Sequence, residues 1–536
     1  MAKAGVDVAR GYPDELIDPA NIIVERCGRE RSFLTAIGGI LWSRMQTATE
    51  WSNVANKVQQ WNRGMSGLFY MCMDDLPPPL LFCFLHFKYF LGKSVMDAKT
   101  IIRLWVAEGF IQPTEEKTAE EVAEIYLEEL IHRNMLQIVS MNDVVGGVET
   151  CRFHDVFKHK TRFISVEFDR RSIVQIKPPS LQPEHLGDYA TVRNKVVHCL
   201  GYITTLSKSK MHKLRYLNIQ HSGGDDLKDI RYLRRLQTLS IDFRCGFDTQ
   251  VNKVMIDLSQ IRKLRHLILL HKSHPNEKIS LIGLETAKYL QTLEVPAGDW
   301  IERALDKLTN LRTLKIRGCK DSHGEALKNS LIKLTLLTTL HLIGEGGFPG
   351  MHTLSSLIHL IELEMGSPLN ESIPPIGPIE LGTNVLPPNL KKLTLWRCEL
   401  GHYLMRLLGN LDDLRYLQLY KDRSHLVDDE VWHMRPGDFP KLQVLDLVGV
   451  ERVVEWSIDE GALPHLRQLS IVGCRKLKKL PNGLKHISTL RRLELSKSFE
   501  ERVKRDTGED WNEIKHVPEI DATYMDLDIN RNLLLL

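Results

Sequence analysis

A six-residue phrase of the form Leu-x-x-Leu-x-Leu/Ile recurs through the C-terminal two thirds of this 536-residue chain. Its mean step is roughly 25 residues. In an extended strand, residues two apart share a face, so the last two apolar residues of each phrase point the same way. One repeat cannot bury that face alone, whereas stacked repeats bury it together. The phrase begins at Leu214, Leu236, Leu264, Leu290, Leu311, Leu337, Leu360, Leu390, Leu414, Leu442, Leu466 and Leu490.

This period and spacing are typical of leucine-rich repeats, which stack into a curved parallel sheet. Cys319, Cys398 and Cys474 each fall three residues after the last apolar residue of a phrase. The repeat consensus places Asn or Cys there, because a small side chain fits under the turn that leaves the strand. We therefore predict an α/β fold, a leucine-rich-repeat solenoid, in which these thiols serve packing rather than reactivity or metal binding.

Composition narrows the function classes. The formal charge is +3, which is no global signature of nucleic-acid binding, and the nine cysteines without a CxxC pair favour a reducing compartment. The N-terminus lacks the apolar core of a signal peptide. The most apolar run, Leu80–Leu91, is too short to span a bilayer and predicts a buried helix. We expect a cytoplasmic protein without a membrane span.

The segment before the repeats has helical patterns followed by a hairpin pattern. We predict helices over Asp97–Gly109 and Thr118–Asn134, and strands at Leu136–Val139 and Val148–Phe153. Helices followed by a small hairpin are typical of a winged helix. The predicted organisation is a helical segment at 1–65, a winged helix at 66–165, a linker with degenerate repeats at 166–210, leucine-rich repeats at 211–500 and a C-terminal tail at 501–536.

Several of these segments resemble a known family. Leu104–Ile111, Thr118–Leu130 and Cys151–Asp155 resemble the winged helix of plant nucleotide-binding leucine-rich-repeat (NB-ARC) disease-resistance proteins. The resemblance implies an intracellular immune receptor that nucleotide exchange switches between a closed and an assembled state. Other matching segments are the Cys83-Phe84 pair, three pieces of the preceding helical subdomain (residues 22–28, 37–39 and 50–51), and Gly508–Trp511 with Ile514–Pro518, which are similar to the closing segment of cereal-type members.

The nucleotide-binding motifs of that family do not match. The Gly-Lys-Ser at Gly92–Ser94 has Phe87 where a phosphate-binding loop needs glycine. Asp74-Asp75 lies after the position of the family's acidic strand end, and Arg31 stands in place of the proline that packs on adenine. The resemblance is therefore to an N-terminally truncated member. We expect no cofactor, with ADP or ATP bound only if the missing nucleotide-binding half is present.

His154 does match the family motif, in which this histidine contacts the phosphate of bound ADP. The preceding residue is usually Met and is Phe153 here. Without a phosphate loop on this chain, we expect either a half-buried histidine at a strand end or a vestigial nucleotide contact.

Protein-binding candidates follow from the repeat geometry. Stacking should align the basic residue after the first leucine of many phrases into one column, which is either a solvated rim or a seam that docks an acidic surface. Side chains between the strand leucines should face the concave surface, where exposed aromatics are good contact candidates. The candidates are Arg265, Arg312, Lys391, Arg415, Arg467 and Arg491 in the column, and Tyr216, Asn218, Trp396, Tyr416, Gln418 and Tyr420 on the concave side.

No catalytic motif is present, and His266, His271 and His274 lack the fourth ligand of a zinc site. The leading hypothesis is a truncated immune receptor, not an enzyme, whose repeats recognise a pathogen effector, a guarded host protein or a full-length receptor. One alternative is a complete ATP/ADP-switched resistance protein whose phosphate-loop half is missing from the gene model. A ubiquitin-ligase adaptor and an extracellular repeat protein are weaker alternatives.

Overall fold

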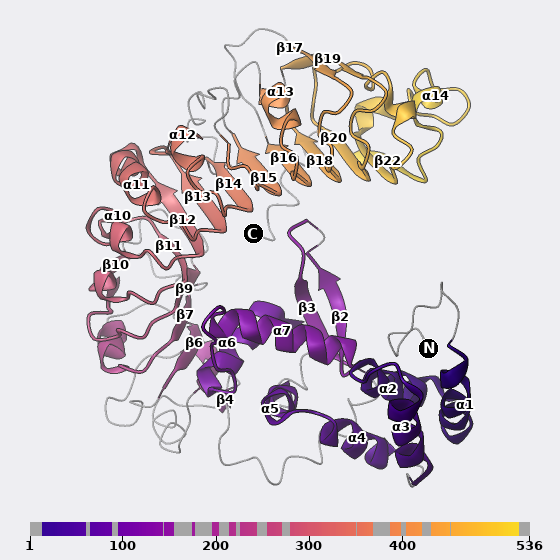
Figure 1. The fold of residues 1–536 in the computed structure, drawn as a ribbon. Coiled ribbons are helices and arrows are strands. Elements are labelled where there is room, and N and C mark those ends of the chain that lie inside the picture. The colour runs from indigo at the N-terminus through magenta and orange to yellow at the C-terminus, as the bar shows by residue number, and fades with distance from the viewer. Residues whose placement is uncertain are drawn as a thin grey trace. The chain divides into compact units, whose positions relative to one another are not determined.

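The structure is a computed structural model, and its chain divides into two compact units (Figure 1). Unit 1 comprises Met1–Ile203, Ser207–Gln220 and Arg235–Thr238, and unit 2 the rest of the chain. The structure describes residues 13–60, 65–87, 95–142, 144–154, 174–176, 196–202, 214–220, 226–243, 254–270, 279–349, 351–367, 386–397, 404–420, 430–450 and 452–524.

Unit 1 begins with a set of short helices. A 3-10 turn at Asp14–Leu16 leads into α1, and prolines at the start of α5 suit the first turn of a helix, where an amide hydrogen has no partner. Helix α5 is the one predicted from the apolar run at Leu80, and its second half is buried. The helices are α1 (Ile17–Arg26), α2 (Arg31–Trp42), α3 (Ala48–Gln60), α4 (Met65–Asp74) and α5 (Pro78–His86).

The winged helix forms as its sequence signals predict. Asp97 caps α6 (Ala98–Glu108) by accepting from Thr100 N at 2.7 Å, and Gly109 ends the helix in the left-handed region with φ 81°. Thr118 and Glu121 form a capping box at the start of α7 (Ala119–His132). Strands β2 (Leu136–Met141) and β3 (Val148–Phe153) pair antiparallel, and β1 (Met96–Asp97) joins β3.

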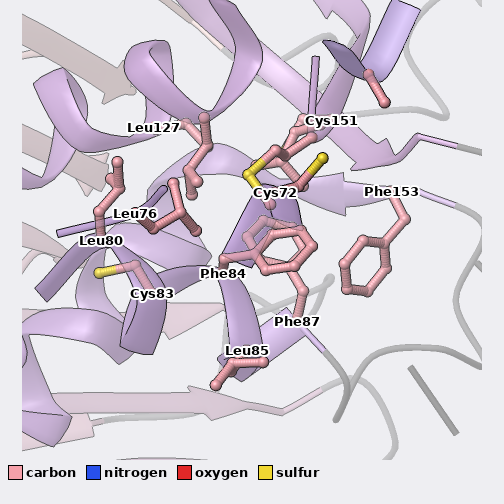
Figure 2. Packing of buried hydrophobic residues seen from close by; sticks show 14 of the residues in the cluster. Cys72, Leu76, Leu80, Cys83, Phe84, Leu85, Phe87, Leu127, Cys151 and Phe153 are labelled. Carbon is pink, nitrogen blue, oxygen red and sulfur yellow. The ribbon is translucent and has the colours of Figure 1, made fainter. Parts of the chain in front are cut away.

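One apolar core holds these helices and strands together (Figure 2). Phe84 meets Phe153 edge to face with ring centroids 5.5 Å apart, and Phe87 meets Phe153 at 5.3 Å. Cys83 is fully buried in the same core, and burial raises the pKa of its thiol. The Cys83-Phe84 pair singled out in the sequence is therefore a packing element that joins α5 to the hairpin.

Parallel strands also occur in unit 1, in the region predicted as linker with degenerate repeats. Strand β4 (Val174–Ile176) pairs with β5 (Val196–Tyr202), which pairs with β6 (Tyr216–Gln220). Strand β6 packs against α6, and Arg215 donates to the carbonyl oxygen of Ala107 at 3.4 Å. The repeat pattern thus begins before residue 211.

Unit 2 is a run of parallel strands that follow one another along an arc (Figure 1). Each strand of the arc except the last, β22, begins next to the second leucine of a phrase, so the predicted repeats are confirmed. The strands are β7 (Thr238–Asp242), β9 (His266–Leu270), β11 (Thr292–Pro296), β12 (Thr313–Cys319), β13 (Thr339–Gly344), β14 (Glu362–Gly366), β15 (Lys392–Trp396), β16 (Tyr416–Tyr420), β18 (Val444–Val448), β20 (Gln468–Val472), β21 (Arg492–Ser496) and β22 (Glu519–Tyr524).

Short helices and two small strand pairs return the chain along the outer side of the arc (Figure 1). The strand pairs are parallel, β8 with β10 and β17 with β19. These elements are η6 (Asp226–Tyr232), β8 (Val254–Asp257), β10 (Ile279–Ile282), η7 (Leu284–Thr286), α10 (Trp300–Arg303), η8 (Leu305–Lys307), η9 (Asp321–His323), α11 (Gly324–Leu331), α12 (Met351–Leu354), α13 (Leu404–Gly409), β17 (Glu430–Met434), β19 (Val453–Ile458), η10 (Leu484–His486), η11 (Lys497–Phe499) and α14 (Trp511–Ile514).

The leucines of each phrase fill the space between the sheet and the outer elements. In the phrase at Leu311, Leu311, Leu314 and Ile316 have no exposed surface, and the other phrases repeat this pattern. Cys319 is fully buried in its predicted slot, and burial raises the pKa of its thiol to about 12. Cys474 donates weakly to two backbone carbonyls. Cys398 lies outside the described residues.

The last repeat is closed by the segment around Gly508–Trp511. Asp510 accepts from Leu480 N at 3.2 Å and binds the guanidinium of Arg502 through both oxygens, at 2.8 and 2.9 Å. Glu513 accepts from Gly483 N at 2.9 Å. Strand β22 then extends the parallel sheet beyond residue 500, so residues 501–524 form the closing repeat rather than a tail.

We predict that Asp510→Ala lowers the free energy of unfolding by about 2–3 kcal/mol, because it leaves the buried amide of Leu480 without an acceptor and removes both Asp510 contacts of Arg502, which keeps only Glu509. The measurement is the urea midpoint of unit 2 unfolding. The matched control is Glu509→Ala, since the Glu509 side chain is 76% exposed although it also pairs with Arg502. Equal effects of the two substitutions would contradict this role.

Candidate functional site

A backbone ladder aligns the residue after the first leucine of successive phrases in unit 2. The carbonyl of Arg265 accepts from the amides of Gln291 and Thr292, and the same double acceptance repeats down the array. We call the resulting row the leading-edge column, because it lies where the strands begin. Its members are Arg265, Gln291, Arg312, Thr338, Ile361, Lys391, Arg415, Gln443, Arg467 and Arg491.

The column exists, but its charge is uneven. Uncharged residues interrupt it, and Gln443 separates the pair Lys391 and Arg415 from the pair Arg467 and Arg491. Asp413 ion-pairs with Lys441 at 2.6 Å, and this contact, with further help from Lys391 and Arg415, lowers the pKa of its carboxyl. The first pair is thus partly neutralised.

The second pair of the column is the more available one. Arg467 and Arg491 are exposed, and no acidic side chain in the described parts of the chain lies within ion-pair distance of either. Adjacent parallel strands lie about 4.8 Å apart, so the two guanidinium groups leave the column close together. Of the basic residues in the column, this exposed pair best fits the predicted seam for an acidic surface.

The concave face has a second aligned row, formed by the residue between the two inward leucines of each strand. Strand pairing places these residues side by side, and their chemistry changes from strand to strand. We call this the central row. From β11 to β22 it comprises Glu294, Lys315, His341, Glu364, Thr394, Gln418, Asp446, Ser470, Glu494 and Asp521, whereas β9 has the apolar Ile268 at this position.

Tyr416 and Gln418, both predicted on the concave side, surround Asp446, an acid that is half-buried. Gln418 donates to Asp446 at 3.1 Å, and the hydroxyls of Tyr416 and Ser470 also hydrogen-bond this carboxyl. Burial raises the pKa of Asp446 despite these hydrogen bonds. Asp446 holds the two predicted residues in fixed positions, and sequence reasoning missed it. Its position between the inward leucines of Leu445-Asp-Leu447 was the available signal.

A second polar cluster lies two strands away. His341 contacts Glu364 at 3.1 Å and Glu362 at 3.4 Å, and Lys392 binds Glu362 at 2.9 Å. Burial opposes ionisation of Glu362, but His341 and Lys392 outweigh it and lower the pKa of that carboxyl. These side chains are mostly covered, so the cluster presents a fixed pattern of charge rather than mobile side chains.

The predicted aromatics Trp396 and Tyr420 occupy concave positions but are not exposed. They pack on each other with ring centroids 4.7 Å apart and form a cluster with Val448, with exposed fractions of 5–8%. Burial, followed by the nearby Asp446, raises the pKa of Tyr420 to about 12. The prediction that these rings are free for contact is wrong, because neighbouring strands bring flat side chains into stacking distance.

Tyr216 is likewise buried rather than available. It belongs to the core of unit 1, where β6 packs against α6, and only 2% of its surface is exposed. Its hydroxyl hydrogen-bonds Asn218, which is half-buried. Both residues were predicted as concave contacts, and the structure gives Tyr216 a packing role instead.

The residues matched to the nucleotide motifs have ordinary surroundings. His154 follows β3 and is half-buried, and its amide donates to the carbonyl of Met135 at 3.1 Å. Arg31 is the exposed first residue of α2. Gly92–Ser94 and Asp155 lie outside the described residues. His154 thus has the position expected of a histidine at a strand end.

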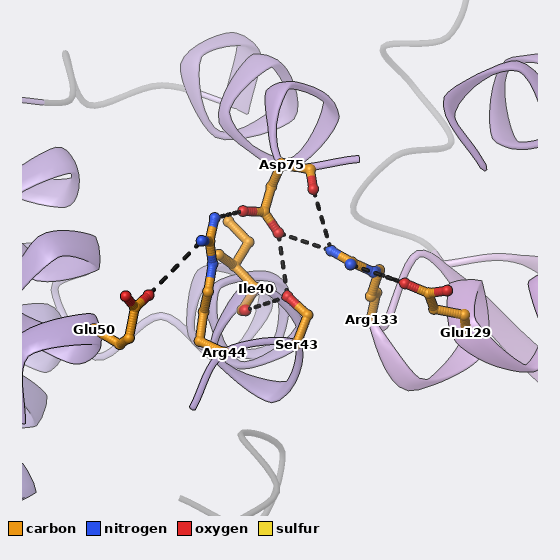
Figure 3. A network of polar contacts seen from close by, with 7 residues as sticks. All are labelled: Ile40, Ser43, Arg44, Glu50, Asp75, Glu129 and Arg133. Carbon is orange, nitrogen blue, oxygen red and sulfur yellow. Dashed lines mark hydrogen bonds and ion pairs between the residues drawn. The ribbon is translucent and has the colours of Figure 1, made fainter. Parts of the chain in front are cut away.

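Asp75 is the centre of a polar network that joins three segments of unit 1 (Figure 3). It ion-pairs with Arg133 at 2.7 Å and with Arg44, and it accepts from Ser43 at 3.3 Å. Arg133 also binds Glu129 at 2.9 Å. The network connects the end of α2 to the end of α7, so Asp75 has a structural role and not that of a Walker-type acid.

The α2–α7 junction is also sterically tight. A side chain at Gly39 would place its Cβ 1.8 Å from the carbonyl oxygen of Arg133, so only glycine allows this approach. Trp42 stacks on His132 with ring centroids 4.6 Å apart. Helix packing therefore explains the glycine at position 39 of the matching segment 37–39.

The described part of the chain was searched for clusters of metal ligands and for membrane-spanning helices, and it has neither. No group of three or more His, Cys, Asp or Glu there is arranged to hold a metal ion. His266 is buried, and its Nδ1 lies 3.1 Å from the Thr292 hydroxyl, whereas His271 and His274 are outside the described residues. No described helix has the length and apolar character needed to cross a bilayer.

Comparison with protein families agrees with this architecture. The family model described as "Leucine-rich repeat region" matches residues 196–519, and "Disease resistance protein Winged helix domain" matches residues 90–159. The chain belongs to the leucine-rich-repeat disease-resistance proteins. The repeat match includes β5, from the segment predicted as linker with degenerate repeats, and β22, from the segment predicted as a tail.

Relatives in this family come from Arabidopsis thaliana. "Probable disease resistance RPP8-like protein 2" is 25% identical over 570 residues, which cover 93% of this chain and 61% of the relative. "Disease resistance protein RPP8" is 25% identical, with 93% and 60% covered. The chain thus spans about three fifths of their length. Among solved structures, a leucine-rich-repeat protein of Leptospira interrogans covers 68% of this chain and 87% of its own, with 18% identity and a TM-score of 0.44.

We predict that Asp75→Ala lowers the free energy of unfolding of unit 1 by about 2–3 kcal/mol, since the buried guanidinium of Arg133 loses one of its two carboxylate partners and keeps only Glu129. Chemical denaturation followed by tryptophan fluorescence measures the change. Glu50→Gln is the control, because Glu50 lies 3.7 Å from Arg44 and both are about a third exposed. If Asp75→Ala is no more destabilising than this control, the network is not structural.

Proposed function

We propose that this disease-resistance chain is the recognition part of a plant immune receptor. Its partner is a protein: a pathogen effector, a guarded host protein or a full-length receptor. The observation that carries the proposal is the central row, where a rigid strand array carries polar side chains that differ from strand to strand, all but the buried Thr394 and Ser470 partly exposed. Such an array suits recognition of a shaped protein surface rather than turnover of a small molecule.

The fixed polar clusters support this reading. Asp446 and Glu362 are held by hydrogen bonds or ion pairs before any partner arrives, so little side-chain entropy is lost on binding. The same holds for Tyr416 and Gln418, whereas Arg467 and Arg491 add long-range attraction for an acidic partner. In this proposal the concave face gives specificity and the end of the leading-edge column speeds association. The protein acts in the cytoplasm.

A second candidate function is an ATP/ADP-switched receptor in which a nucleotide-binding half precedes this chain. The observation that favours it is the winged-helix match together with relatives that are longer than this chain. In that case His154 would contact the phosphate of ADP. Sequencing the transcript upstream of Met1 for a phosphate-binding loop distinguishes the two candidates.

We predict that the purified chain does not hydrolyse ATP, because its only Gly-Lys-Ser lacks the glycine that lets backbone amides surround phosphates. The measurement is release of inorganic phosphate over hours at saturating ATP. His154→Ala serves as the control and should leave the background unchanged. Turnover that disappears in His154→Ala would instead support an active nucleotide site.

We predict that exchanging charges on the concave face abolishes recognition without unfolding the chain. The double variant Glu294→Lys with Lys315→Glu reverses two neighbours of the central row while keeping the net charge. We expect a loss of about tenfold or more in the disease-resistance response, scored in plants at equal protein level. The measurement includes circular dichroism to show that the fold is intact.

A matched control for this exchange exists in the same repeat. Glu325→Lys with Lys328→Glu makes the same exchange on α11, on the outer side of the arc, where the two side chains are exposed. This control should retain the full response. A response lost equally in both variants, or in neither, contradicts recognition by the central row.

A further inference from the structure

Two half-buried carboxylates on the concave face have opposite surroundings. Burial opposes ionisation of Glu362, but His341 and Lys392 outweigh it and lower the pKa of that carboxyl. Asp446 has no such help, since no basic side chain among the described residues lies within ion-pair distance of its carboxyl. Burial raises the pKa of Asp446, and the negative charge of Glu494 raises it further. The chain thus balances the charge of one covered carboxylate and leaves the other unbalanced.

The acids that flank Asp446 in the central row do have basic partners. Glu364 contacts His341 at 3.1 Å, and Glu494 binds Arg492 at 2.7 Å. The concave face therefore does not lack cations in general. The missing cation is specific to Asp446, which lies on the strand between those of Gln418 and Ser470 in the middle of this half of the array.

Two tyrosines beside Asp446 experience its negative charge. Burial raises the pKa of the phenol of Tyr416 and of Tyr420, and Asp446 is the next largest cause in both cases. For Tyr420 the result is a pKa of about 12. A carboxylate that is removed from water without an opposite charge costs free energy, which an incoming cation recovers. The surroundings of Asp446 therefore favour a cation supplied from outside the chain.

The hydrogen bonds of Asp446 determine which cation fits. Gln418 donates at 3.1 Å, and the hydroxyls of Tyr416 and Ser470 also hydrogen-bond the carboxyl. A carboxylate has about four acceptor positions, so these bonds leave roughly one of them free. A guanidinium binds best through two parallel N–H bonds, whereas an ammonium is a compact charge that can use a single acceptor. The free position suits lysine better than arginine.

The ring of Tyr416 already has an ammonium on its face. Lys392 Nζ lies 5.5 Å from the ring centroid, which is within the range of a cation–π contact. Lys392 also binds Glu362 at 2.9 Å, so its charge is used there. The contact shows that this part of the concave face can hold an ammonium group. The Asp446 carboxyl, at the hydroxyl end of the same ring, offers a second place for one.

We propose that Asp446 anchors a lysine side chain that a partner protein projects onto the concave face. The inference rests on the proposed function, because it names the group that the central row receives. The carboxyl is fixed before binding, and the ammonium supplies both the missing donor and the missing charge. The leading-edge column has the opposite preference, since Arg467 and Arg491 attract acidic groups at the strand starts. A partner suited to both has a lysine among acidic residues.

Melting temperature distinguishes an anchor from a structural acid. Asp446→Asn keeps an acceptor oxygen for Gln418 and removes a charge that burial disfavours, so its melting temperature at pH 7 should equal or exceed that of the wild type. The matched comparison is Glu362→Gln. The lowered pKa of Glu362 stabilises the fold fully at pH 7, so this variant should melt at a lower temperature. If Asp446→Asn is destabilised as much as Glu362→Gln, the carboxyl is structural and the inference is wrong.

Peptide selection tests the anchor directly. A phage library of short random peptides is depleted on immobilised Asp446→Asn and then selected on the immobilised full-length wild type. We expect the enriched peptides to share a lysine, and their Kd should rise about tenfold or more on Asp446→Asn or when norleucine replaces that lysine. Asp412→Asn is the matched control, because it removes an equal charge from an exposed acid of the same repeat and should bind like the wild type.

Several results of the selection contradict the anchor. They are a depleted library that yields no binder, binders without a lysine, and a lysine that arginine replaces without loss of affinity.

The response in plants separates this inference from the proposed function. Asp446→Asn should lose the disease-resistance response at equal protein level, and Asp412→Asn should keep it. A response that survives Asp446→Asn but not the exchange of Glu294 and Lys315 overturns the anchor and leaves the proposed function standing. A response that survives the exchange, together with lysine peptides that need Asp446, contradicts the proposed function and leaves the anchor standing.

Discussion

The backbone ladder between repeats is the constraint on which the rest of unit 2 depends. Each phrase exposes apolar side chains that only the next repeat can cover, and the double hydrogen bond to carbonyls such as that of Arg265 sets the register of that next repeat. Since the ladder uses backbone atoms alone, the side chains between the leucines are free to vary. Buried structural side chains and variable side chains thereby alternate along the same strand.

This constraint explains how much of the fold could be predicted from the sequence. The spacing of the leucines predicted the strands, the leading-edge column and the buried position of Cys319. Each of these depends on the repeat period, which is visible in a single sequence. The winged helix was predictable for a similar reason, since Asp97, Gly109 and Thr118 act through local backbone contacts. Local and periodic interactions leave a signal in a single sequence.

Contacts between repeats leave no such signal. Alternation along a strand predicted which face Trp396 and Tyr420 occupy, but whether a ring is covered depends on neighbours about 25 residues away. The same distance hid the role of Asp446, which is linked to a residue of the preceding repeat and to one of the following repeat. The end of the array was misplaced because β22 lacks the leucine phrase and still completes the sheet.

The last repeat and the α2–α7 junction of unit 1 share one physical problem. Apolar packing ends there, and the polar groups that it covers still need hydrogen-bond or ion-pair partners. Asp510 meets this need at the last repeat, and Asp75 meets it where α2 and α7 converge, each by pairing a buried carboxylate with arginine. Replacing one partner of such a pair is costly, but the intact pair adds little net stability. The carboxylates of Asp510 and Asp75 therefore contribute more to specifying where segments join than to the net stability of the fold. Lysines outside these pairs remain exposed, which is why a structural cap and a charged surface occur together at the last repeats.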